Sequence, residues 1–219
     1  RQLNTGPIIL GFTCSIAMGK SETSKIFNRL GIPVFDADAS VHQMLAKGGE
    51  AVTAVSTIFP GVVQGDAVDR RMLGDLVFGN ARKLRKLEAI LHPLVAKARK
   101  RFLRLAGAAR ARVVVMDVPL LYETGGKDAC HAVVVVSAPK CVQRSRALRR
   151  PGMSEKKLED ILDKQTPDHL KRKQADFVVL SGLGKRSALT KVSSVLRTLQ
   201  SGQVSGKKLV MPVGGGRSA

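Results

Sequence analysis

The triplet Gly19-Lys20-Ser21 is the group of residues whose types and spacing most directly suggest chemistry. It closes a stretch, residues 11–21, that fits the phosphate-loop pattern G-x-x-x-x-G-K-[ST] except that Cys14 holds the first glycine position. Backbone N–H groups of such a loop bind triphosphate oxygens, while the lysine adds positive charge and the serine hydroxyl binds Mg²⁺. The triplet alone also fits a surface turn with a solvated lysine, so the flanking segments must decide.

A phosphate loop joins a β-strand to a helix, and the flanking residues fit that requirement. The apolar run 7–10 predicts a short buried strand before the loop. After Ser21, the residues Ile26, Phe27 and Leu30 recur at helical spacing, which predicts a helix. The stretch is therefore expected at a strand-to-helix turn, where the positive end of the helix dipole attracts phosphate.

Two acidic residues follow the next predicted strand, residues 31–35. Open α/β sheets place their chemistry at the carboxyl ends of strands, so Asp36 and Asp38 are candidate site residues. On a continued strand both carboxylates would lie on one face, whereas a turn into a helix would separate them. Asp38 fits equally well as the N-cap of a helix that continues through Val41 and Met44.

Two continuous β-branched runs, residues 113–117 and 132–137, predict parallel strands that are covered on both faces. The first run ends in Asp117, and a carboxylate there suits the binding of Mg²⁺ or its water opposite a phosphate loop. A last short strand is expected at residues 176–180. The strands and the helices between them predict an α/β fold in which helices flank a parallel sheet.

Residues 38–105 lack strand patterns, so we expect a helical lobe inserted between strands. Asn80 can cap a helix with Leu84, Leu87, Leu91 and Leu94 on its apolar side, kinked or interrupted near His92-Pro93. His92 fits a packed or capping role better than catalysis, and nothing nearby has metal-ligand spacing.

Basic residues dominate residues 140–150, and Arg146 and Arg150 are one helical turn apart, so we expect them to face the same way. Paired guanidinium groups suit a lid that closes over transferring phosphates, although a solvated basic helix fits the same residues. Helices are also expected at 154–165 and 187–199. We expect one domain over residues 1–200, with the lid region at 139–170 and a disordered tail at 201–219.

The 219 residues carry a net charge of +20, and residues 82–112 hold eleven Lys and Arg against one acid, Glu88. Such a surface attracts polyanions, but the absence of Trp and an aromatic content of 4% disfavour base stacking, so no specific nucleic-acid partner is expected. No apolar run approaches a membrane span, and residues 1–15 lack the order of a signal peptide. Three cysteines without metal-ligand spacing fit free thiols in a cytoplasmic protein.

In order and spacing, six segments resemble those of the dephospho-CoA kinase family, which are P-loop kinases. These segments are GFTCSIAMGKS, VFDADASVH, LEAILHPLV, VVVMDVPLLYETGG, VQRSRALRRPGMSEKKLEDILDKQ and ADFVVLSGLG. The resemblance covers nearly all of residues 7–199 and implies a P-loop kinase-type sheet with a helical substrate lobe and a small lid. It also implies ATP-dependent phosphorylation of the ribose 3′-hydroxyl of dephospho-CoA, the last step of coenzyme A biosynthesis, with Mg²⁺.

The resemblance assigns a role to each matching residue. Asp38 would take the proton from the attacking hydroxyl, and Lys20, Arg146 and Arg150 would be the other catalytic residues. ATP would be bound by Ser15, Ile16, Ala17, Met18, Gly19, Lys20, Ser21 and Glu22; the acceptor by Asp38, His92, Pro119 and Leu120; and Mg²⁺ by Ser21 and Asp117. For His92, Pro119 and Leu120 a structural role fits as well.

Three positions depart from that family's usual pattern, which has glycine at the positions of Cys14 and Ala17 and threonine at that of Glu22. Ala17 adds only a methyl group unless its position requires a positive φ. Glu22 adds negative charge beside Ser21 but also complements the helix dipole. We expect Cys14 to strain the loop most and to weaken ATP binding by roughly five- to thirtyfold, so that Cys14→Gly would improve it.

Two other functions fit parts of the sequence. A kinase for a nucleotide or another small alcohol would share the loop and the lid and would differ in the acceptor lobe. A non-catalytic P-loop protein that binds nucleotide or nucleic acid would fit the altered loop and the basic surface. Such a protein has no physical need to keep Asp38, Lys20 and the lid arginines together. Nothing in the sequence indicates the oligomeric state.

Overall fold

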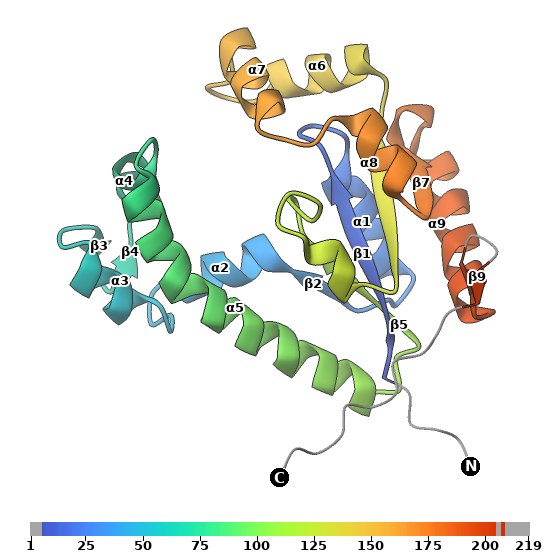
Figure 1. Cartoon of the computed structure of the whole chain (residues 1–219), viewed down its shortest axis with the longest axis horizontal. Helices are drawn as coiled ribbons and strands as arrows, with labels where there is room; N and C mark the ends of the chain where they lie inside the picture. Colours follow the sequence, from blue (N-terminus) through green and yellow to red (C-terminus); the bar gives the residue numbers. More distant parts are fainter. Residues whose placement is uncertain (1–5, 205–206, 209–219) are drawn as a thin grey trace. The chain divides into compact units, whose positions relative to one another are not determined.

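The computed structural model describes residues 6–204 and 207–208 of the chain (Figure 1). These residues divide into two compact units. The first unit holds the residues up to Phe35 and those from Ala106 onward, and the second is Asp36–Leu105. The sequence pattern had suggested a helical lobe over residues 38–105. No helix in the described part of the chain is long and apolar enough to cross a membrane.

A five-stranded sheet forms the centre of the first unit, in the order β2-β5-β1-β6-β7 (Figure 1). Its strands are β1 (Ile8–Cys14), β2 (Val34–Asp36), β5 (Val113–Asp117), β6 (Ala132–Ser137) and β7 (Phe177–Leu180). The central strand, β1, pairs in parallel with β5 on one side and β6 on the other, and β6 pairs in parallel with β7. The predicted α/β fold, a parallel sheet flanked by helices, is confirmed.

Alternate residues of β6 belong to two different apolar clusters, one on each face of the sheet. Val134 and Val136 lie in a cluster with residues of helices α1 (Lys20–Arg29) and α9 (Lys185–Gln200). Val133 and Val135 lie in a second cluster with Leu121. Because both faces are covered by apolar side chains, the strand shows no polar alternation in its sequence.

Helix α1 is fixed against β1 by a pair of fully buried aromatic rings. Phe27 of α1 and Phe12 of β1 meet edge to face with ring centroids 5.4 Å apart. Strand β1 is longer than the predicted run 7–10, because it continues as far as Cys14, which pairs with Val136 of β6. The turn between strand and helix is therefore residues 15–19, called loop 15–19 below.

The first unit also has several shorter helices. It contains α6 (Lys140–Leu148), α7 (Glu155–Asp163), α8 (Asp168–Gln174) and the 3₁₀ helices η1 (Gly126–Ala129) and η2 (Ser181–Leu183). Within the predicted tail, β8 (Gln203–Val204) and β9 (Lys207–Lys208) pair as an antiparallel hairpin. The remaining residues of that tail, 205–206 and 209–219, lie outside the described residues.

The second unit consists of helices around a small core of its own. Its helices are α2 (Ala37–Leu45), α3 (Val52–Ile58), α4 (Arg70–Val77) and α5 (Ala81–Ala108). A hairpin of β3 (Val63–Gln64) and β4 (Ala67–Val68) was not predicted, since two-residue strands leave no alternation pattern in a sequence. Val55, Val62 and Leu73 are among the buried residues that hold these elements together.

Helix α5 runs through His92-Pro93, so of the predicted kink or interruption the interruption is wrong and the kink stays a prediction. Pro93 has no N–H to donate to the carbonyl oxygen of Ala89. Both residues are exposed, so water can bind that oxygen and the helix can continue. The predicted start is confirmed, because the Asn80 side chain accepts a hydrogen bond from the Lys83 N–H at 3.0 Å.

Candidate active site

Loop 15–19 lies at the carboxyl end of the central strand, where an open α/β sheet forms its binding crevice. Gly19 caps the N-terminus of α1 with a φ of 93°, a conformation that glycine adopts without strain. A Cβ at this position would lie 2.8 Å from the Ser181 hydroxyl oxygen, so a side chain has no room. These two constraints explain the glycine of the triplet, and the helix N-terminus after it is suited to phosphate.

The sheet brings Lys20 and Asp117 together from distant parts of the sequence. Asp117 ends β5 and is the register partner of Phe12 on β1. Lys20 Nζ lies 2.5 Å from Asp117 Oδ1, and the two side chains are 19% and 3% exposed. The first residue of α1 is thus held by a buried carboxylate at the strand ends, where a phosphate group would be bound.

Two of the predicted residues offer oxygen ligands that fit Mg²⁺. Ser21 is an exposed residue of α1 directly after Lys20, whose ammonium group touches the Asp117 carboxylate. Within the described residues, no group of three or more His, Cys, Asp or Glu side chains could hold a metal ion. A hydroxyl and a single carboxylate suit Mg²⁺, which is usually held by few protein ligands together with phosphates and water.

The strain expected at Cys14 is found at Ala17 instead. Cys14 is the last residue of β1 and is buried, and it does not have a positive φ. Ala17 has a φ of 59°, in the left-handed region that costs a non-glycine residue about 1–3 kcal/mol. The expected gain in ATP affinity from Cys14→Gly therefore loses its basis, because that substitution would only empty a packed strand position.

The Cys14 thiol is expected to be unreactive in the folded protein. Burial raises its pKa to about 11, although the ammonium groups of Lys20 and Lys171 oppose this rise. At pH 8 the thiol is therefore protonated and a poor nucleophile. Brief alkylation with iodoacetamide, read by peptide mass spectrometry, should modify the exposed Cys141 and leave Cys14 intact until the protein is unfolded. Equal labelling of the two in the folded state would contradict this.

The negative charge of Glu22, the residue after Ser21, is paired with two lysines, Lys25 and Lys185. Its carboxylate oxygens lie 2.7 Å from Lys25 Nζ and 3.1 Å from Lys185 Nζ. The hydrogen bond from Lys25, followed by that from Lys185, lowers the pKa of Glu22 to about 2. The carboxylate therefore stays ionised at neutral pH and is partly compensated on the surface of α1.

Two glutamines that sequence reasoning missed hold the backbone of Ile16. Gln165 Oε1 accepts a hydrogen bond from the Ile16 N–H at 3.0 Å, and Gln143 Nε2 donates to the Ile16 carbonyl oxygen at 2.9 Å. Both glutamines lie in the predicted lid region, at residues 139–170. An uncharged amide gives no signal of this role in a sequence.

Ser181 is a further missed residue, and it connects loop 15–19 to one of the predicted lid arginines. Its hydroxyl donates to the Met18 carbonyl oxygen at 2.5 Å and accepts a hydrogen bond from Arg146 Nη1 at 2.8 Å. Arg146 Nη2 also donates to the Ser181 carbonyl oxygen at 3.2 Å. Arg146 is thus half-buried at the loop, bound through Ser181.

The two predicted lid arginines differ in their backbone, because Arg146 lies within α6 and Arg150 lies beyond its end; that their guanidinium groups face the same way stays a prediction. Helix α6 ends at Leu148, and Arg150 is an exposed residue in the turn that follows. Pro151 explains the early end, because a proline disfavours helical backbone in the residue before it. Arg146 is brought to the loop through Ser181, and the role of Arg150 stays a prediction.

A buried ion pair anchors the segment that carries Gln165. Glu123 Oε1 accepts a hydrogen bond from the Thr166 N–H at 2.8 Å and lies 2.9 Å from Lys171 Nζ. Lys171 is fully buried, which is rare for a lysine. Burial alone would raise the pKa of Glu123, but the Lys171 ammonium and the Thr166 N–H bring it below the ordinary value.

In the second unit, Asp36 rather than Asp38 caps helix α2. The Asp36 side chain accepts a hydrogen bond from the Ala39 N–H at 2.9 Å. The alternative in which Asp38 is merely the N-cap is therefore wrong. Asp38 is the second residue of α2 and is exposed, and the chain turns into a helix at this point, so the two carboxylates are not paired as on a strand.

The other predicted acceptor residues have varied surroundings. His92 is exposed on α5, so the interpretation of it as a packed residue is wrong. Leu120 is 42% exposed, whereas the next residue, Leu121, is in the core. The Pro119 carbonyl oxygen accepts a hydrogen bond from the Thr13 hydroxyl at 2.8 Å, which ties this segment to β1. Acceptor binding by His92, Pro119 and Leu120 stays a prediction.

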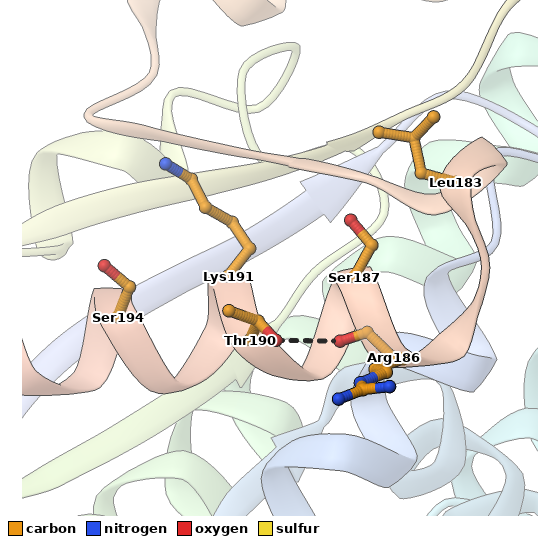
Figure 2. Close-up of a pocket in the computed structure, with 6 residues that line it drawn as sticks. All are labelled: Leu183, Arg186, Ser187, Thr190, Lys191 and Ser194. Carbon is orange, nitrogen blue, oxygen red and sulfur yellow. Dashed lines mark hydrogen bonds between the residues drawn. The ribbon is translucent and has the colours of Figure 1, made fainter.

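A hollow of about 630 Å³ lies elsewhere in the first unit, along α9 (Figure 2). Its lining residues come from successive turns of that helix and from η2: Leu183, Arg186, Ser187, Thr190, Lys191 and Ser194. Figure 2 shows the Thr190 hydroxyl bonded to the Arg186 carbonyl oxygen of its own helix, at 3.1 Å. The hollow is open and contains none of the predicted site residues, so we do not assign chemistry to it.

The chain is similar to known proteins over both of its units. Residues 8–184 match the family model described as dephospho-CoA kinase. The dephospho-CoA kinase of Rhodospirillum rubrum is 50% identical over 196 residues, which cover 89% of this chain and 93% of that protein. That of Paramagnetospirillum magneticum is 50% identical over 210 residues, or 96% and 97% of the two chains. The crystal structure of TT1252 from Thermus thermophilus has a TM-score of 0.75 at 31% identity, over 89% of this chain and 98% of that one.

Proposed function

The chain belongs to the dephospho-CoA kinase family, and from that premise we propose how its residues act on the substrate. It is a phosphotransferase that phosphorylates dephospho-CoA with ATP as co-substrate, in the biosynthesis of coenzyme A. The acceptor that we propose is the ribose 3′-hydroxyl. The observation that supports a phosphate site best is the contact of Lys20 with buried Asp117 beside loop 15–19.

Phosphoryl transfer requires mainly alignment and the neutralisation of charge. We propose that the N–H groups of loop 15–19 and the start of α1 bind the β- and γ-phosphates, with Lys20 as a point charge on them. Arg146 is the lid arginine with the better support, because Ser181 binds both Arg146 and the Met18 carbonyl oxygen. Arg150, exposed in the turn that follows α6, is the second arginine proposed to act on the phosphates.

Ser21 and Asp117 would hold Mg²⁺, which when bound supplies positive charge to the phosphate oxygens. The protein's own part is to place one hydroxyl and one carboxylate at adjacent strand and helix ends. The Asp117 carboxylate would then serve both Mg²⁺ and Lys20, because the Lys20 ammonium group contacts it in this structure.

We propose that Asp38 takes the proton of the attacking 3′-hydroxyl. Asp36 supplies the cap of α2, so the exposed carboxylate of Asp38 is not needed to start the helix. A general base in this role typically contributes about 10²–10⁴-fold to the rate. Three free cysteines, one of them exposed, support a cytoplasmic location as part of the same proposal.

The proposed function is tested by coupled ADP release with ATP, Mg²⁺ and a panel of acceptors. We expect turnover with dephospho-CoA and none with its 3′-deoxy analogue, and phosphorus NMR should show a 3′-phosphate in the product. Preferential turnover of nucleoside monophosphates or other small alcohols would instead support the broader kinase assignment. Absence of turnover with every acceptor, together with measurable ATP binding, would support the non-catalytic alternative.

A further inference from the structure

We infer that Gln143 and Gln165 are positioning residues for ATP, which together hold Ile16 and Ala17 of loop 15–19 in the shape that binds phosphate. The inference rests on the ATP site proposed above. It adds two side chains from outside the loop that the loop pattern does not include.

The two glutamines bind the backbone on both sides of the Ile16 Cα. One bond, to Gln165, uses the N–H of Ile16, and the other, from Gln143, uses its carbonyl oxygen. That carbonyl belongs to the peptide group that continues into Ala17. Gln143 is only 6% exposed, so water does not easily replace its amide. The orientation of both peptide planes is therefore set by side chains of the predicted lid region.

The residue that follows needs such support. Ala17 has a φ of 59°, which an alanine in a free loop seldom keeps. Its methyl group is buried in a small cluster with Ala147 of α6 and Leu158 of α7. Strained backbone persists where the surroundings over-determine it, and here the two hydrogen bonds and this packing do so. A glycine at this position would need neither the hydrogen bonds nor the packing, because it adopts a positive φ without strain.

Gln165 is itself held in place by the buried ion pair. The N–H of the next residue, Thr166, donates to Glu123, and Glu123 contacts the fully buried Lys171. The acceptor oxygen of Gln165 is therefore presented to Ile16 from a fixed segment between α7 and α8. Glu123 and Lys171 act on the loop only through this segment.

Gln143 and Gln165, with their two hydrogen bonds to the backbone of Ile16, are called the clamp below. Loss of the clamp should appear as weaker ATP binding. If fewer molecules hold the loop in the competent shape, the apparent Kd rises by the same factor as the competent fraction falls. The net contribution of one neutral hydrogen bond corresponds to about a five- to tenfold change in that fraction. The chemical step, once ATP is bound, should change much less.

The test is a double-mutant cycle with Gln165→Met and Ala17→Gly, read as the Kd for ATP by isothermal titration. In the unmodified background, Gln165→Met should raise the Kd about five- to tenfold. In the Ala17→Gly background it should raise the Kd by less than about twofold, since glycine adopts the positive φ unaided. Gln174→Met, at an exposed position of α8, is the matched control and should leave the Kd unchanged.

An equal loss of affinity in both backgrounds, or no loss in either, would overturn the inference. If Gln165→Met does not fold, Gln143→Met takes its place in the same cycle. A second measurement is independent of ATP: hydrogen exchange of the Ile16 N–H should speed up in Gln165→Met, and unchanged exchange would contradict the clamp. Failure of the unmodified protein to bind ATP would count against the proposed function, while the exchange experiment would still decide on the clamp.

Discussion

Asp38→Asn is expected to lower kcat by about 10²–10⁴-fold, the usual contribution of a general base. The substitution keeps the size of the side chain and removes the proton acceptor. The Kd for ATP should stay nearly unchanged, because the proposed ATP contacts are made by loop 15–19 and the start of α1. Coupled ADP release and an ATP titration on the same preparation measure the two quantities separately.

Asp36→Asn is a closely matched control for that experiment. It removes a neighbouring carboxylate, but asparagine caps helices about as well as aspartate, so α2 should keep its start. Turnover of Asp36→Asn should therefore stay near that of the unmodified protein. If Asp38→Asn also turned over normally, the assignment of Asp38 as the base would be wrong.

Lys20→Met is expected to reduce kcat by about 10²–10³-fold, as the loss of one preorganised charged or donor group in an active site commonly does. Lys20 is held by buried Asp117 at the strand ends, so its ammonium group has a fixed position beside the proposed phosphate site. The Kd for ATP should rise as well, since the lysine contacts phosphate in the ground state too. Steady-state kinetics with varied ATP measure both effects.

The control for this prediction is Lys25→Met, on the same helix. Lys25 is exposed and pairs with the surface carboxylate of Glu22, and exposed pairs contribute little. Its removal should leave kcat and the ATP Kd almost unaltered. Circular dichroism of both variants would show whether the fold is retained, because Lys20→Met removes the ammonium group that contacts buried Asp117. A Lys20→Met protein that is folded and fully active would exclude the proposed role.

Much of the sheet could be predicted because its strands are unusually uniform. The runs that became β5 and β6 are continuous and β-branched, and their lack of alternation indicated coverage on both faces, which the burial of every residue in both strands confirms. The triplet Gly19-Lys20-Ser21 was equally informative, since its position between a strand and a helix is what a phosphate loop requires. Asp117 could be proposed because it ends a strand.

Other features depended on interactions that no local pattern records. The end of β1 was missed because Gly11 and Cys14 resemble loop residues, although pairing with β6 makes them strand residues. Backbone strain in the loop depends on φ, which cannot be read from a sequence. The strain was therefore predicted at Cys14, whereas the residue with a positive φ is Ala17. Gln143, Gln165 and Ser181 contact the loop over long sequence separations, so their role follows from tertiary structure alone.

The order of the strands has a consequence for how the chain is made on the ribosome. β1 is the middle strand of the sheet, yet both of its partners, β5 and β6, are encoded after the whole of the second unit. The emerging N-terminal segment therefore stays unpaired until those strands have been synthesised, with its apolar residues available to chaperones in the meantime. The second unit has a core built entirely from its own residues. Its helices can therefore pack together before β5 and β6 are available to pair with β1.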